Sequence, residues 1–130
     1  KIALALAQND IPFNMMWLRI LDITTGSLET IPLSLHWISD IAWSPNSRQM
    51  AVGGHRILQS ERLFEVYLVD THTKEFRKIP EVSEGFLAGY RDAGLTWSKN
   101  GRTLLYSCIP AESTVDFGIC ESLVTVREIR

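Results

Sequence analysis

The chain has 130 residues, of which 45% are hydrophobic and 22% charged, a composition that is ordinary for a globular domain and excludes a disordered segment. Its formal net charge is −2 and its 13 lysines and arginines are scattered, which argues against a nucleic-acid partner and against attraction to an anionic membrane surface. The apolar run at residues 2–7 is far shorter than the roughly 20 residues of a membrane-spanning helix, so it predicts a buried strand and no membrane insertion.

Short apolar segments separated by turn residues follow one another along the chain, and no segment has the periodicity and the two caps of a helix. The sequence therefore predicts an all-β protein. In chain order, strands are expected at residues 1–8, 16–23, 28–32, 38–44, 48–53, 63–70, 74–80, 94–98, 102–109 and 119–128.

Two sequence elements occur twice in the same order. A Trp-Ser pair followed by a polar turn begins at Trp43 and again at Trp97, which lie 54 residues apart. An apolar strand that ends in aspartate before a threonine-containing turn ends at Asp22 and again at Asp70, 48 residues apart. Repeats of about 40 to 50 residues are typical of the four-stranded blades of a β-propeller. We therefore expect Trp43 and Trp97 to pack between blades, and Asp22 and Asp70 to stabilise turns.

The repeats predict a single propeller segment with three blades. Residues 1–35 form a blade that lacks its first strand, residues 36–80 a complete blade, and residues 81–130 a blade that lacks its last strand. Closed propellers have about four to eight blades, and incomplete blades leave large apolar faces uncovered. We therefore expect the chain to belong to a longer propeller or to be completed by other subunits.

The repeated elements resemble the TolB-type, WD-repeat-like β-propeller family, whose repeats carry a Trp-Ser-Pro-Asp-Gly hairpin followed by Lys or Arg and an apolar strand. The matching segments are residues 43–48 and 97–102 for the hairpin, and residues 21–26 and 69–74 for the family's later Asp-to-Thr-Gly turn. The departures are asparagine for aspartate in both hairpins, Lys99 for proline, Ser47 for glycine, and Arg127 at the place of the repeated aspartate. The resemblance implies the architecture and a scaffold role, without naming a ligand.

If strands alternate in direction, the longer connections share one face of the propeller. These connections are expected at residues 9–15, 54–62, 81–93 and 110–118, and binding residues concentrate on such loops. Aromatic, methionine and arginine side chains are enriched at protein interfaces. The candidate partner-binding residues are Phe13, Met15, Met16, Arg56, Arg62, Phe86, Tyr90, Arg91 and Asp92. The alternative is that these side chains fold back on the blade beneath.

The stretch around Phe86 and Tyr90 holds six residues more than the first repeat requires. Truncating both side chains to alanine is therefore expected to abolish partner capture without changing the β-sheet circular dichroism.

No catalytic, phosphate-binding or dinucleotide-binding motif is present, so we expect neither enzymatic activity within this chain nor a cofactor. Three histidines lie on different expected connections without metal-ligand spacing, and we expect them to be solvated loop residues: His36, His55 and His72.

The chain has two cysteines, Cys108 and Cys120, which fall on expected neighbouring strands joined by one loop. This spacing permits a cross-strand disulfide, and the alternative is a pair of buried free thiols. A disulfide favours an exported or periplasmic protein, and free thiols a cytoplasmic one, so the compartment stays open.

The leading functional interpretation is a non-catalytic propeller segment that recognises a protein or peptide through the face with the long connections. The alternative is the propeller portion of a hydrolase resembling the prolyl oligopeptidases, with the nucleophile on another domain. A downstream Gly-x-Ser-x-Gly motif would distinguish this alternative. A third interpretation is a purely structural subunit of a large assembly.

Overall fold

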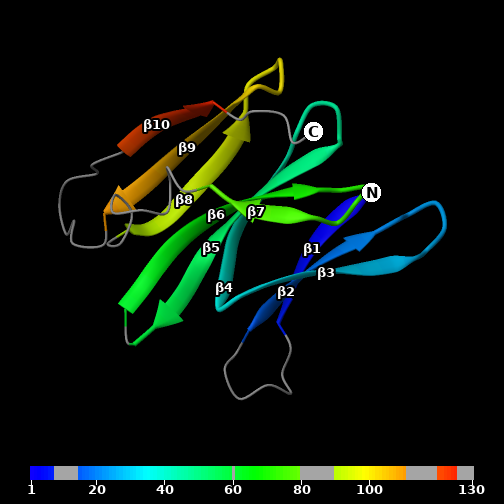
Figure 1. Cartoon of the computed structure of the whole chain (residues 1–130), viewed down its shortest axis with the longest axis horizontal. Coiled ribbons are helices and arrows are strands. Elements are labelled where there is room, and N and C mark those ends of the chain that lie inside the picture. The colour runs from blue at the N-terminus through cyan, green and yellow to red at the C-terminus, as the bar shows by residue number, and fades with distance from the viewer. Residues whose placement is uncertain (8–14, 60, 80–89, 111–119, 126–130) are drawn as a thin grey trace.

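The computed structural model describes residues 1–7, 15–59, 61–79, 90–110 and 120–125 of the chain. These residues form three antiparallel sheets, and the middle sheet lies between the other two (Figure 1). The prediction of an all-β protein is confirmed. Nowhere in these ranges is there a helix long and apolar enough to cross a membrane.

Each sheet is built from strands that are consecutive in the sequence. The first sheet has the order β1 (Ile2–Ala7), β2 (Met16–Leu21), β3 (Leu28–Leu35). The middle sheet has the order β4 (Trp37–Trp43), β5 (Gln49–Leu58), β6 (Glu61–Asp70), β7 (Phe76–Lys78). The last sheet has the order β8 (Tyr90–Trp97), β9 (Thr103–Pro110), β10 (Cys120–Thr125). Within the middle sheet, no connection is longer than five residues, and such short connections join adjacent antiparallel strands.

The two tryptophan-containing turns have the same hydrogen bonds. Asn46 Oδ1 accepts a hydrogen bond from the Ser44 hydroxyl at 2.7 Å and from the backbone N–H two residues further on at 3.0 Å. Asn100 Oδ1 accepts the corresponding bonds, from the Ser98 hydroxyl at 2.7 Å and from the backbone N–H two residues further on at 3.0 Å. In both turns the asparagine side-chain oxygen therefore accepts the hydrogen bonds that an aspartate carboxylate would accept.

The fourth residue after each of the two tryptophans has a left-handed backbone. Gly101 has φ of 69°, which glycine adopts without steric cost, whereas Ser47 has φ of 58° at the equivalent position. The backbone conformation of this turn is thus conserved between the two copies although the residue differs.

The two aspartate-containing turns are also equivalent. Asp22 Oδ1 accepts a hydrogen bond from the Thr24 backbone N–H at 2.9 Å. Asp70 Oδ1 accepts from the backbone N–H groups of His72 at 2.8 Å and Thr73 at 2.9 Å. Both aspartates stabilise turns, as predicted from the repeat.

These hydrogen bonds favour the charged form of each carboxylate. The backbone N–H groups that bond Asp22 hold its pKa below the ordinary value. Burial raises the pKa of Asp70, but the backbone N–H groups of Thr73 and His72, together with the Arg48 guanidinium, outweigh burial and lower the pKa on balance.

Because the pKa of Asp70 is lower in the folded chain, Asp70 contributes stability above its unfolded pKa of about 4, and this contribution is lost as the pH falls through the folded pKa. We expect Asp70→Asn to cost about 1 kcal/mol at neutral pH and to weaken the fall in stability between about pH 5 and pH 2. Urea unfolding at several pH values measures this. Glu75→Gln, at an exposed carboxylate on the same turn, is the control. An unchanged acid dependence in the Asp70 variant would contradict the assignment.

The first and middle sheets enclose one apolar core. Its buried members are Leu18, Ile20, Ile31, Leu33, Leu35, Ile38, Met50, Val52, Tyr67 and Val69. Trp43 is half-buried and packs against this core. The side chains of β2 that alternate with Leu18 and Ile20 lie on the opposite face of the first sheet.

The middle and last sheets are joined by hydrogen bonds as well as by packing. Trp97 Nε1 donates to the Ala42 carbonyl oxygen at 3.0 Å, and the Leu95 backbone N–H donates to Asp40 Oδ2 at 2.7 Å. Trp43 and Trp97 therefore each pack on the preceding sheet, which is the role predicted for them.

The predicted loop at residues 54–62 is wrong. Strand β5 continues to Leu58 and β6 begins at Glu61, and these two residues pair across the ladder. The segment was expected to be a polar loop, but Gly53 and Gly54 are buried within β5, and the polar residues that follow pair across the ladder. Arg56 and Arg62 therefore belong to strands rather than to a loop.

The start of the last sheet also differs from the prediction. Strand β8 begins at Tyr90 instead of residue 94, and Tyr90 pairs with Pro110 across the ladder to β9. Tyr90, Arg91 and Asp92 were expected on a connection, but the end of β9 provides backbone partners for this segment. The other expected long connections fall mainly outside the described residues.

Candidate functional site

One end of the middle sheet carries a group of exposed apolar side chains. Trp37 at the start of β4 is 57% exposed, and Ile57 and Leu58 at the end of β5 are 45% and 51% exposed. We call these three residues the hairpin patch. In Figure 1, β4 begins and β5 turns into β6 at the lower end of the middle sheet, away from the turns that follow Trp43 and Asp70. Exposed apolar residues that lie close together are typical of interaction surfaces.

The ladder between β4 and β5 brings Trp37 and Ile57 to one face of the middle sheet, whereas Leu58, the next residue of β5, lies on the opposite face at the same strand end. Trp37 pairs with His55, and Ile57 lies two residues beyond His55 on the same face of β5. Such diagonal neighbours are close enough for long and aromatic side chains to touch a common ligand. The His36 ring positions this end, because its Nδ1 accepts a hydrogen bond from the Ile57 backbone N–H at 3.1 Å.

The three histidines do not share the solvated state predicted for them. His72 is exposed, as predicted. His55 is only 4% exposed and packs edge-to-face on Phe64, with 5.3 Å between ring centroids. His36 is half-buried and hydrogen-bonded. Among the described residues, no three His, Cys, Asp or Glu side chains are grouped so that they could hold a metal ion.

A polar network braces the extended β5–β6 hairpin from the other face. Arg56 Nε lies 3.1 Å from Glu65 Oε2, and the Tyr67 hydroxyl donates to the same oxygen at 2.6 Å. The Glu65 side chain is only 8% exposed, whereas that of Arg56 is 28% exposed. Burial, together with the bond to Glu65, raises the pKa of the Tyr67 phenol. The network ties the base of the hairpin to the core between the first and middle sheets, since Tyr67 belongs to that core.

Gly54 allows β4 to approach β5 closely at the patch. A Cβ atom at Gly54 would lie 2.2 Å from the Trp37 carbonyl oxygen and 2.7 Å from Leu35 Cδ1. The ladder register shifts between Ile38 and Asp40, directly after this close approach. Glycine at residue 54 is therefore needed for the position of Trp37.

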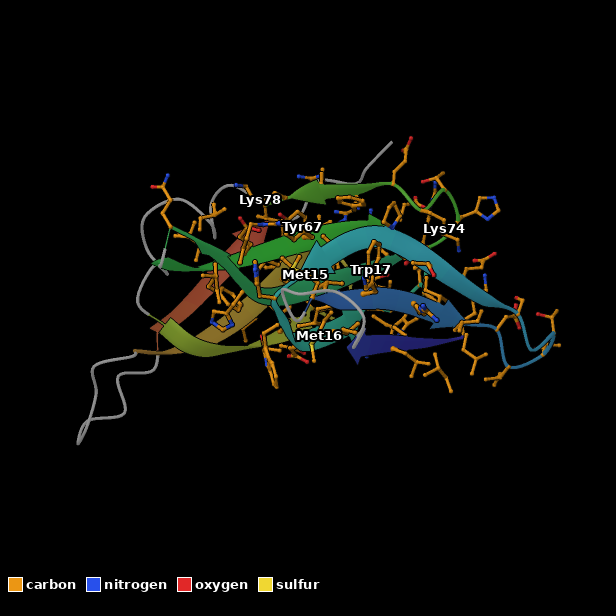
Figure 2. All side chains as sticks on the ribbon, turned by 90° about the horizontal axis from the view of Figure 1, so that it is seen from below. Met15, Met16, Trp17, Tyr67, Lys74 and Lys78 are labelled. Carbon is orange, nitrogen blue, oxygen red and sulfur yellow. The ribbon has the colours of Figure 1, made fainter. Side chains whose placement is uncertain are left out.

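The methionines predicted as partner-binding residues are half-buried. Met16 Sδ accepts a hydrogen bond from the Ile38 backbone N–H at 3.2 Å, and Met16 packs on the core between the first and middle sheets. Met16 thus has the fold-back role that was the alternative to partner binding. Figure 2 shows Met15 and Met16 away from Lys74, which lies on the turn between β6 and β7.

The remaining predicted binding residues are placed only in part. Arg56 lies beside the hairpin patch and is engaged by Glu65. The backbones of four others lie in strands and their side chains are outside the described part of the structure: Arg62, Tyr90, Arg91 and Asp92. Phe13 and Phe86 fall outside the described residues.

None of the three patch residues was among the binding residues predicted from the sequence, and Trp37 also lies outside every long connection that was predicted. Of the four tryptophans, only Trp43 and Trp97 belong to a repeated element. The residue 54 positions after Trp37 is Arg91, so Trp37 is not part of the repeat. A large aromatic residue that the repeat does not require, placed one residue before a predicted strand, is the signal that could have identified it.

The fold matches solved β-propeller structures. The chain is similar to TolB from Acinetobacter baumannii, with 18% identity and a TM-score of 0.51, over 82% of this chain and 24% of that one. It is also similar to the β-propeller domain of the Trilobed protease from Pyrococcus furiosus, which has an open velcro topology, with 15% identity and a TM-score of 0.58, over 95% of this chain and 39% of that one. No family model and no curated protein matches the sequence. The predicted β-propeller architecture is confirmed, and the chain spans well under half the length of either structure.

Proposed function

We propose, from the β-propeller fold, that this chain is a non-catalytic propeller segment that recognises a protein or peptide partner through the hairpin patch. The observation that supports this proposal is the exposure of Trp37, Ile57 and Leu58 on a strand end that is held in place by His36 and by the Glu65 network. Ordered apolar side chains bind a partner without the entropy cost of ordering a loop. Tryptophan is also among the residues most enriched in binding hot spots.

A peptide selected on the intact chain from a displayed library tests this function. We expect Trp37→Ala and Ile57→Ser each to weaken binding of the selected peptide by about tenfold or more, since each removes a central apolar contact. Ile23→Ser is the matched control, because Ile23 is 65% exposed on the turn at the opposite end of the sheets. Equal affinity of the patch variants and the wild type, measured by calorimetry, would contradict the proposal.

The outer face of the first sheet supports the further proposal that another sheet completes this segment. Ile2 and Leu28 on this face are 45% and 46% exposed. Trp17 Nε1 and Arg19 Nε, on the same face, are inaccessible to solvent and have no hydrogen-bond partner among the described residues. Between the middle and last sheets, a tryptophan finds its hydrogen-bond acceptor on the adjoining sheet, because Trp97 Nε1 donates to the carbonyl oxygen of Ala42. An adjoining sheet would supply acceptors and cover the apolar side chains.

Sedimentation velocity tests this completion. We expect the 14.7 kDa chain to self-associate, because Ile2 and Leu28 on the outer face of the first sheet are exposed. The double variant Ile2→Ser with Leu28→Ser is expected to associate less, while Ile23→Ser is expected to behave like the wild type. A compact wild-type monomer that shows no concentration dependence would defeat the idea.

A second candidate function is a gating propeller attached to a peptidase domain. The observation in its favour is the similarity to the propeller domain of the Trilobed protease. The full reading frame tests this candidate, because a Gly-x-Ser-x-Gly motif followed by aspartate and histidine would identify a serine hydrolase domain. A complete frame without a hydrolase domain would remove the peptidase candidate.

A further inference from the structure

The ladder of the last sheet brings the two cysteines of the chain together. Cys108 on β9 pairs directly with Cys120, the first residue of β10. Directly paired residues of an antiparallel ladder have Cα atoms about 4.5 to 5.5 Å apart, which is within the range of about 4.4 to 6.8 Å found in disulfides. A register shift of one residue would place the two residues on opposite faces of the sheet.

A bond between Cys108 and Cys120 would attach an edge strand of the last sheet to its neighbour. β9 and β10 hold the places in the last sheet that β5 and β6 hold in the middle sheet. Strand β9 therefore ends, and β10 begins, at the same end of the sheets as the hairpin patch. Within the described residues β10 pairs with β9 alone, so it is an edge strand held by a single ladder.

We propose that Cys108 and Cys120 form a cross-strand disulfide that closes the base of the 111–119 connection and fixes β10 to β9. The two thiols lose two protons and two electrons, and a sulfur–sulfur bond forms between them. The oxidant is a small-molecule disulfide such as glutathione disulfide, which is reduced to two glutathione thiols. The bond stabilises β10 by restricting the chain between the two cysteines when the strand detaches. This proposal does not depend on partner recognition.

Intact-mass analysis of the full chain tests for the bond. After equilibration with glutathione disulfide, we expect a mass about 2 Da below that of the reduced chain and no uptake of iodoacetamide. Peptide mapping is expected to link the Cys108 and Cys120 peptides, at a yield independent of protein concentration. Two alkylated thiols after equilibration, glutathione attached to both cysteines, or bonds only between chains would each overturn the proposal.

Hydrogen exchange tests the effect of the bond on the edge strand. We expect reduction to speed exchange of the β10 amides by about tenfold or more, with little change in β5 and β6. The variants Cys108→Ser and Cys120→Ser are each expected to show the faster exchange under both redox conditions. Equal β10 exchange in the bridged and reduced wild type would overturn the proposed fixing of the strand, even where mass analysis finds the bond.

Discussion

Replacement of Gly54 by alanine is expected to lower the free energy of unfolding by about 3 kcal/mol or more, a large effect for the addition of one methyl group. The new Cβ atom would lie 2.2 Å from the backbone oxygen of Trp37, and a backbone atom cannot move aside as the end of a side chain can. Relief of the clash requires β4 to separate from β5, which moves Trp37. Urea unfolding measures the loss, and peptide affinity is expected to fall in the fraction that stays folded.

Gly53→Ala is the matched control for this effect. A Cβ atom there would lie 3.1 Å from Leu95 Cδ1 and 3.1 Å from Phe64 Cζ, which are both ends of side chains. These atoms can shift by a few tenths of an ångström, so we expect a loss of about 1 kcal/mol. If the two alanine variants were equally stable, the close approach of β4 to Gly54 would not limit the fold.

Replacement of Glu65 by alanine is expected to cost about 2 to 3 kcal/mol of stability, the second-largest effect that we predict. The change leaves the Tyr67 hydroxyl without its acceptor at 2.6 Å and the partly buried Arg56 guanidinium without its carboxylate. The estimate is below the cost of breaking a fully buried ion pair, because 28% of the Arg56 side chain is exposed to water. Chemical unfolding measures the cost.

Two further variants separate the components of this network. Tyr67→Phe removes only the hydroxyl and is expected to cost about 1 kcal/mol. Glu29→Ala removes an exposed carboxylate whose ion pair with Lys74, at 2.6 Å, lies on the surface, and it is expected to change stability little. A Glu65 variant as stable as the Glu29 variant would show that the network does not brace the hairpin.

These predictions connect the stability of the middle sheet to the proposed binding surface. Gly54 determines how closely Trp37 approaches β5, and Glu65 holds the base of the hairpin that ends in Ile57 and Leu58. A bracing variant is expected to lower stability and to weaken binding only because less of the protein is folded. A patch variant such as Ile57→Ser changes an exposed side chain and is expected to weaken binding with little change in stability. Stability and affinity measured on the same variants therefore distinguish bracing residues from contact residues.

The repeated elements were predictable because their interactions are local. The hydrogen bonds of Asn46 and Asn100 involve neighbours within two residues, and those of Asp22 and Asp70 involve neighbours within three. Such turns depend on the type and order of adjacent residues, which the sequence shows directly. The all-β class followed in the same way from short apolar segments between turns.

The candidate site was less predictable because it depends on pairing across strands. Residues 54–62 resemble a loop in composition. The ion pair that compensates the burial of Arg56 and Glu65 forms only when β5 and β6 pair in the observed register. The sequence shows that Trp37 lies outside the repeat, but its 57% exposure is known only from the structure. Likewise, the sequence left both a disulfide and free thiols open for the cysteines, whereas the β9–β10 register sets them directly opposite each other.

By itself, the sequence determined the repeat, the turn chemistry and the propeller architecture, because each is encoded by contacts between residues close in the chain. Only the tertiary structure decided which polar residues became strand and which apolar side chains stayed exposed. Those outcomes depend on how closely the backbones of neighbouring strands approach each other, as at Gly54 and Trp37. They also depend on which residues pack against each face of a sheet.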